Sequence, residues 1–196
     1  MSQKQKINNS DYPDFWDRKY ILNESKWDIG FPTPVFVDWF NKNSKKKKIL
    51  VPGCGIGHDA LFLARKGHDV YALDFSNEAI KSLSRRAETE NIHINILNKS
   101  IFDMKNYYQK FDIILEYTFF CAINPIDRFK YIKVAYNLLV DNGLFVGMLL
   151  PIQKALNEGG PPFGVDLPET ICIFEKYFEV IECSDSKLSI LPRAGN

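Results

Sequence analysis

From residue 48 onward, short apolar runs alternate with segments in which apolar residues recur at helical spacing, and this alternation constrains the fold more than any other feature. The runs that we interpret as strands are residues 49–51, 70–73, 92–97, 111–115, 144–150 and 180–183. Helices are predicted from residue 59 to the Gly67 stop, after a Ser76 cap, from Pro125 to the turn at 141–143, and over 167–178. Several strands are apolar throughout, which is typical of parallel strands covered on both faces. We therefore expect an α/β, doubly wound, mainly parallel, Rossmann-like sheet.

The length of 196 residues predicts a single domain with a sizeable core. Residues 47–196 would form the Rossmann-like core. Residues 1–46 would form an N-terminal lid with two short helical segments. The second of these is expected to begin at Pro34, behind a capping Thr33.

The formal net charge of +1 gives no general attraction for nucleic acid or for an anionic membrane, and the lysine run 45–48 is interpreted as a solvated loop. No apolar stretch approaches the ~20 residues that span a bilayer, and the polar N-terminus lacks the core of a signal peptide. The four cysteines and three histidines have neither metal-binding nor disulfide spacing. We predict a cytoplasmic protein without a metal site, a monomer or weak homo-oligomer that acts on a small molecule.

The turn after the first strand, residues 51–59, carries glycines at positions 53, 55 and 57. In an open α/β sheet this turn lies at the carboxyl edge, where ligands bind. A dinucleotide site favours G-x-G-x-x-G, whereas the sixth position here is His58. The pattern argues against a pyrophosphate, and so against a nicotinamide-dependent oxidoreductase. It suits a cofactor whose amino-acid and ribose portions rest on the glycine backbone, the alternative being a tight turn without a ligand.

Asp74 ends the second strand, where a carboxylate can accept hydrogen bonds from ribose hydroxyls. A helix-capping role near Ser76 is the alternative. Two further loops, 99–103 and 116–120, fall at the same edge of the sheet. The aromatic residues Phe119 and Phe120 of the second loop either border the site or pack the sheet.

Five sequence elements, in this order, resemble the thiopurine, thiol and halide methyltransferases over about residues 15–193. The elements are residues 27–30 with Thr33 and Pro34, residues 51–55, residues 100–103, residues 120–125 with Arg128, and residues 159–163. The resemblance implies a class I methyltransferase fold. It also implies S-adenosylmethionine as the methyl donor and S-adenosylhomocysteine as the product.

The residues that the resemblance implies for cofactor binding are Trp16, Trp27, Gly53, Gly55, Asp74, Ser100, Ile101 and Tyr117. Trp16 and Trp27 would close over the cofactor, with Tyr20 beside them. Gly53 and Asp74 would hold its methionine and ribose parts, and the loop at 100–101 would flank adenine. Tyr117 would lie near the donor sulfur and the substrate, and it is the residue implied to be catalytic.

The pair Glu116 and Tyr117 resembles the acidic-Tyr pair of the thiol and halide branch, which predicts a small, soft nucleophile, either a thiol or hydrosulfide. Phe163 stands where the plant halide enzymes resemble one another in a tyrosine, which argues against halide turnover. The alternatives are a halide, thiocyanate or thiopurine methyltransferase, or a catalytically weak relative that binds S-adenosylmethionine. A DNA amino-methylating enzyme is disfavoured because residues 116–119 lack its Asn/Asp-Pro-Pro-aromatic signature.

Aromatic residues make up 14% of the chain, and we expect some of them to exclude water from the site. The residues predicted to form this closing lid are Trp16, Trp27, Phe31, Phe36, Tyr117 and Phe163. The family pattern continues beyond a segment like residues 192–195 into one more strand, whereas this sequence ends at Asn196. The last edge strand is therefore expected to be missing or shortened, with residues 187–191 as the candidate for a stunted strand.

Overall fold

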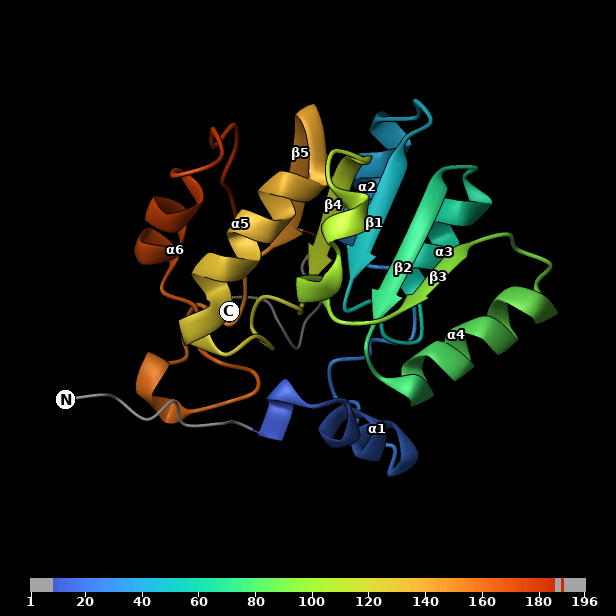
Figure 1. Cartoon of the computed structure of the whole chain (residues 1–196), viewed down its shortest axis with the longest axis horizontal. Helices are drawn as coiled ribbons and strands as arrows, with labels where there is room; N and C mark the ends of the chain where they lie inside the picture. The colour runs from blue at the N-terminus through green and yellow to red at the C-terminus, as the bar shows by residue number, and fades with distance from the viewer. Residues whose placement is uncertain (1–8, 186–187, 189–196) are drawn as a thin grey trace.

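The computed structural model describes residues 9–185 and residue 188. Five strands form one sheet in the order β3-β2-β1-β4-β5, with every neighbouring pair parallel (Figure 1). Their bounds are β1 Lys48–Pro52, β2 Asp69–Asp74, β3 Asn95–Asn98, β4 Phe111–Tyr117 and β5 Leu139–Met148. The chain moves outward from β1 to β3 and then returns to place β4 on the other side of β1. The carboxyl ends of β1 and β4 therefore flank the point where the strand order reverses, which is where ligands bind in such sheets.

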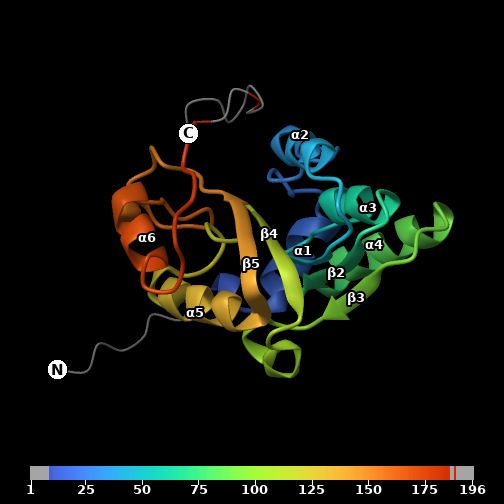
Figure 2. The ribbon, with the colours of Figure 1, turned by 90° about the horizontal axis from the view of Figure 1, so that it is seen from above.

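The helices cover both faces of this sheet, as the apolar runs predict. They are α1 Pro13–Ile21, α2 Pro34–Lys42, α3 His58–Arg65, α4 Asn77–Thr89, α5 Arg128–Leu138 and α6 Leu167–Phe174. Figure 2 shows α5 and α6 on one side of the sheet and α2 and α3 on the other. Successive residues of β1 divide between the two cores: Ile49 and Val51 pack with α2 and α3, whereas Leu50 packs with α5. Among the described residues, no helix is long and apolar enough to cross a membrane.

Helix α1 lies outside these two layers, across the carboxyl ends of the strands (Figure 1). It packs against α4. Tyr12 precedes the helix in an extended conformation, and Pro13 opens it. The N-terminal segment thus reaches the edge of the sheet where the glycine turn lies.

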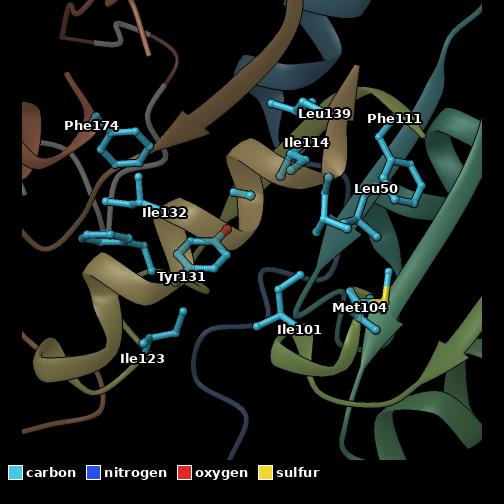
Figure 3. Packing of buried hydrophobic residues seen from close by; sticks show 14 of the residues in the cluster. Leu50, Ile101, Met104, Phe111, Ile114, Ile123, Tyr131, Ile132, Leu139 and Phe174 are labelled. Carbon is cyan, nitrogen blue, oxygen red and sulfur yellow. The ribbon is translucent and has the colours of Figure 1, made fainter. Parts of the chain in front are cut away.

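The core between α5 and the sheet holds the position of β4. Figure 3 shows Tyr131 and Ile132 of α5 near residues of the strands, among them Leu50 and Ile114. Tyr131 is fully buried, and its ring packs edge-on against Phe119, with the centroids 5.3 Å apart. Because a close-packed interior transmits strain, the turn after β4 is held from behind by this helix.

Three details differ from the sequence-based expectations. No strand forms over residues 180–183, where Val180 and Ile181 are 40% and 79% exposed. The residues that pack on Phe145 of β5 are instead Phe174 and Phe178. The described sheet thus has five strands, and the alternative at 187–191 lies outside the described residues apart from residue 188. The turn expected at 141–143 lies within β5, which starts at residue 139 because a register irregularity extends the pairing with β4.

The two predicted caps have different outcomes. Ser76 caps α4, since its Oγ accepts a hydrogen bond from the Ala79 N–H at 3.2 Å. Thr33 occupies the expected N-cap position of α2, but its side chain makes no cap hydrogen bond. Its hydroxyl donates a hydrogen bond instead to Asp59 of α3. Burial raises the pKa of Asp59, and a carboxylate removed from water needs hydrogen-bond donors from the protein.

Candidate active site

Two cavities lie side by side at the carboxyl edge of the sheet. The larger has a volume of about 270 Å³ and is bordered by Trp16, Trp27, Gly53, Asp74, Ser100 and Ile101. The smaller has a volume of about 60 Å³ and is bordered by Gly55, Tyr117, Phe31, Asp28, His58 and Asp59. The residues common to both linings are Tyr20, Trp27, Gly53 and Thr118. The two cavities therefore meet between the N-terminal segment, the glycine turn and the turn after β4.

The glycine turn separates the floors of the two cavities. Gly53, Gly55 and Gly57 all have positive φ, at +59°, +55° and +84°. This left-handed conformation is open to glycine at little cost and disfavours side chains that branch at Cβ. The ring of Phe119 also lies against Gly53, in the space that a side chain at position 53 would need. The sequence therefore needs glycine at 53 for two independent reasons.

Asp74 is the buried acid of the larger cavity, with only 8% of its surface exposed. Its Oδ1 accepts a hydrogen bond from the Ser76 N–H at 2.9 Å, and its Oδ2 accepts one from the Gly55 N–H at 2.9 Å. Burial raises its pKa to about 6, although these hydrogen bonds act in the opposite direction. A carboxylate offers about four acceptor positions, so both oxygens can still accept hydrogen bonds from a ligand.

The N-terminal segment covers the cavities with three aromatic side chains that contact one another. Trp16 and Trp27 meet edge-to-face with centroids 5.2 Å apart, and Tyr20 meets Trp27 in the same way at 5.6 Å. The indole Nε1 of Trp27 donates to the Tyr20 hydroxyl at 3.3 Å, and that of Trp16 donates to the Ser10 carbonyl at 2.9 Å. Each polar end of these rings is thus paired, which leaves apolar surface toward the ligand space.

Helix α1 is fixed to α4 through Asp17. Its Oδ1 accepts hydrogen bonds from the Ser76 hydroxyl at 2.6 Å and from the Glu78 N–H at 3.1 Å. Partial burial would raise the pKa of Asp17, but hydrogen bonds from Ser76, Glu78 and Asn77 outweigh it and lower the pKa. The acid also lies at the positive end of the α4 dipole, where a negative charge is stabilised. Ser76 therefore connects Asp17 of the lid to Asp74 of the cavity floor.

A second attachment fixes the end of the lid segment to α3. The N–H and hydroxyl of Thr33 donate to the two carboxyl oxygens of Asp59, at 2.7 and 2.8 Å. Nearby, His58 Nε2 lies 3.1 Å from Asp28 Oδ1, and His58 Nδ1 lies 3.2 Å from an Arg86 nitrogen. Burial and the Arg86 charge lower the pKa of His58, so its imidazole is neutral at pH 7.

The turn after β4 supplies the wall between the cavities. Glu116 is fully buried, and its Oε1 accepts hydrogen bonds from the N–H groups of Phe119 at 2.9 Å and Phe120 at 2.8 Å. Burial raises the pKa of Glu116 to about 7. Tyr117 points to the other face of the sheet, where its ring lies edge-on to Phe36 at 6.0 Å. Thr118 follows Tyr117 and borders both cavities.

Of the eight residues expected to bind a cofactor, six border the larger cavity, whereas Gly55 and Tyr117 border the smaller. The expected lid is only partly assembled. Phe36 belongs to the buried core under α2, and Phe163 borders neither cavity because Arg128 holds its carbonyl and that of Gly164. The inclusion of these two residues in the lid was wrong.

Sequence reasoning missed the roles of Asp17 and Asp59, and it included Thr118 only as a member of the 116–120 loop. The carboxylates act through contacts with residues 59 and 26 positions away, and no local pattern encodes such pairs. Lys99, from the loop at 99–103, and Lys130, to which no motif pointed, also border the larger cavity.

Comparisons with known proteins place the chain among methyltransferases. A family model described as thiopurine S-methyltransferase matches residues 12–194. Probable thiol methyltransferase 2 of Arabidopsis thaliana is 31% identical over 188 residues, which cover 92% of this chain and 80% of that protein. Thiocyanate methyltransferase 1 of the same plant is 31% identical over 155 residues, which cover 78% of this chain and 67% of that protein.

A solved structure gives independent support for the fold. The 1,6-didemethyltoxoflavin-N1-methyltransferase of Burkholderia thailandensis, with bound 1,6-didemethyltoxoflavin and S-adenosylhomocysteine, aligns with a TM-score of 0.61 at 17% identity. The match covers 74% of this chain and 65% of that one. At this identity the likeness confirms the doubly wound fold alone.

Proposed function

This chain belongs to the thiopurine S-methyltransferase family, and from that premise we propose that it methylates a small, soft nucleophile, either a thiol or hydrosulfide, at the junction of its two cavities. Membership of the family makes it an S-adenosylmethionine-dependent methyltransferase. The observation that carries the proposal is the pair of cavities, one large and one small, that share Gly53 and Thr118. We assign the larger to the methyl donor and the smaller to the acceptor.

The residues of the larger cavity fit this donor. Its volume of about 270 Å³ is near the lower end of the ~300–1,000 Å³ common for small-molecule sites. Gly53 borders this cavity, and Asp74 keeps acceptor capacity for hydroxyl groups. The aromatic faces of Trp16 and Trp27 suit a cationic ligand.

When bound, S-adenosylmethionine supplies an electrophilic methyl group on a sulfonium. The residues of the chain have to hold the nucleophile in line with that group and to exclude water. We propose that Asp74 and the 100–101 loop fix the nucleoside end, and that Trp27 and Tyr20 close the junction. Tyr117 borders the smaller cavity and would orient the acceptor there. The acceptor sulfur would form the new bond to the methyl carbon as the bond from that carbon to the sulfonium breaks, S-adenosylhomocysteine would leave with the electron pair, and the thiol proton would pass to water.

The smaller cavity supports a small acceptor that enters uncharged. A water molecule needs about 10–15 Å³ of such volume, so about 60 Å³ admits only a few non-hydrogen atoms and no purine. The charged side chains that border it are Asp28 and Asp59, and among its described lining residues there is no lysine or arginine. Because no lysine or arginine among these lining residues would neutralise an anion, we favour a thiol or hydrogen sulfide over halide or thiocyanate.

The test measures S-adenosylhomocysteine production when the purified protein meets S-adenosylmethionine and each of six acceptors. These are hydrosulfide, methanethiol, a larger thiol, thiocyanate, iodide and a thiopurine. We expect turnover of hydrosulfide and methanethiol, and less with each larger or anionic acceptor. Turnover of iodide or a thiopurine alone would contradict the assignment of the smaller cavity. Cofactor binding without any turnover would instead favour a catalytically weak relative.

A matched pair of variants tests the donor site. Asp74→Ala should weaken the affinity for S-adenosylmethionine about 10–150-fold, because each charge-assisted hydrogen bond contributes about 1.5–3 kcal/mol. Asp69→Ala removes an exposed carboxylate at the other end of the same strand and should leave the affinity unchanged. Isothermal calorimetry gives both values. An Asp74→Asn variant, with unfolding curves for all three, separates loss of the ligand contact from loss of the backbone hydrogen bonds.

We also propose that the enzyme acts in the cytoplasm on a small molecule, as a monomer or weak homo-oligomer. The four cysteines, at 54, 121, 172 and 183, are free, which supports a reducing compartment. Cell fractionation and sedimentation would test these two points. A disulfide-linked or membrane-associated species would contradict them.

A further inference from the structure

Thr118 has a backbone conformation that its side chain disfavours. Five non-glycine residues among those described have positive φ: Asn23, Asn91, Gln109, Thr118 and Asn142. Asparagine tolerates this region, but a branched Cβ crowds the backbone there, so a threonine at φ +60° is a clear outlier. Such strained residues persist where the surrounding structure holds them, and they concentrate at functional sites.

The restraint on Thr118 comes from its neighbours in the turn. The carboxylate Oε1 of Glu116 binds the two N–H groups that follow, those of Phe119 and Phe120. The thiol of Cys121 donates to the Thr118 carbonyl at 3.2 Å. A carboxylate that accepts two successive N–H groups closes a tight turn, so the residue just before them has little freedom. Glu116 contacts neither cavity and acts only through this turn.

Thr118 lies at the junction of the two cavities. Of the four residues common to both cavities, Tyr20 and Trp27 belong to the N-terminal segment, and Gly53 has no side chain. Thr118 therefore supplies the side chain at the junction that comes from the sheet itself. Within the described part of the chain, its hydroxyl makes no hydrogen bond to another protein group. A free hydroxyl at this place is available to a ligand.

We propose that Thr118 positions the acceptor sulfur beside the methyl donor, and that Glu116 is the positioning residue that holds Thr118 in its strained conformation. The inference rests on the proposed function, because it assumes an acceptor in the smaller cavity. The Thr118 hydroxyl donates a hydrogen bond to the acceptor sulfur and fixes its direction of approach. The strain is retained because a relaxed turn would move this hydroxyl away from the junction.

The first test replaces the strained residue by the one residue that is relaxed there. The control is Gln109→Gly, at an exposed residue that is also left-handed but borders neither cavity. Both variants, Thr118→Gly and Gln109→Gly, should keep the Tm within about 4 °C of the wild type. Relief of the left-handed strain offsets the extra freedom of the unfolded chain. Thr118→Gly should lower kcat/KM for hydrosulfide or methanethiol at least about tenfold, while the Kd for S-adenosylhomocysteine changes less than about threefold. Gln109→Gly should keep full activity.

Conservative variants separate positioning from simple structural support. Thr118→Ser retains the hydroxyl and should recover most of the activity that Thr118→Gly loses. Glu116→Ala should raise the acceptor KM and lower kcat together. Glu116→Gln, whose amide oxygen can still accept both N–H groups, should recover a large part of that loss.

The outcomes distinguish the inference from the function beneath it. An active wild type with an equally active Thr118→Gly variant would overturn the inference and leave the proposed function intact. Equal losses of acceptor turnover and cofactor affinity in that variant would also overturn it, because the defect would then be general. A wild type that neither methylates nor binds any acceptor on the panel would overturn the proposed function, and the inference with it.

Discussion

Glu116 should make the stability of this protein depend on pH in a predictable direction. Its carboxyl is fully buried, and burial raises its pKa from 4.5 to about 7. The pKa of Glu116 is higher in the folded protein than in the unfolded chain. Its stabilising contribution to the free energy of unfolding is therefore complete below about pH 4.5 and is lost as the pH rises through 7. The folded protein therefore becomes less stable on this account between pH 5 and pH 8.

The size of this effect follows from the shift. One pKa unit corresponds to about 1.4 kcal/mol, so a shift of two to three units corresponds to about 3 kcal/mol at full ionisation. At pH 5 about 1 kcal/mol is already lost, which leaves about 2 kcal/mol of change up to pH 8. Glu116→Gln is neutral at every pH and removes this dependence. Relative to the wild type, the variant should gain about 2 kcal/mol of unfolding free energy between pH 5 and pH 8.

Urea unfolding of both proteins at pH 5 and pH 8 measures this double difference. The raised pKa of Asp74, about 6, acts in the same direction in both proteins and cancels, as does any pH-independent cost of the new amide. Glu90→Gln is the control, because a hydrogen bond from Arg65 lowers the pKa of that carboxylate below 4.5, so its titration lies below this pH range and the variant should follow the wild type between pH 5 and pH 8. A difference between Glu116→Gln and wild type that is equal at both pH values would refute the reasoning.

Two further substitutions test the turn and the lid. Gly53→Ala should cost about 2–4 kcal/mol of unfolding free energy, because of the left-handed backbone and the collision with Phe119. Gly30 is also left-handed but lies in open space, so Gly30→Ala should show only the backbone cost. Equal losses of unfolding free energy in urea would contradict the close approach at residue 53. Asp17→Ala should weaken S-adenosylmethionine binding about fivefold and speed proteolysis of the N-terminal segment, because the hydrogen bonds to Ser76 and Glu78 are lost. Asp14→Ala, at an exposed position on the same helix, should do neither, and an equal effect of the two substitutions would show that the attachment lies elsewhere.

Local sequence signals were sufficient to predict the strands and the turn that border the site. The apolar runs predicted the parallel sheet, and the glycine turn and Asp74 were placed correctly because each is defined by the strand that it ends. Contacts between residues that are far apart in the sequence were harder to predict. Thr33 looked like a cap from its neighbours, yet its hydroxyl binds Asp59, 26 positions later. The strand expected at 180–183 does not form, because a short, mostly apolar run does not specify a pairing partner, which only tertiary packing supplies.

The lid and the floor of the site are made at different times during synthesis. Asp17 and Ser76 are 59 positions apart, so at about 5–20 residues per second the ribosome completes the second about 3–12 s after the first. During that interval Asp17 has no Ser76 to hold the segment that carries Trp16 and Trp27. A nascent chain of this protein therefore presents the aromatic residues of its N-terminal segment before the residues that fix that segment exist. We expect this interval, rather than the finished fold, to be when the chain is most prone to aggregate or to need a chaperone.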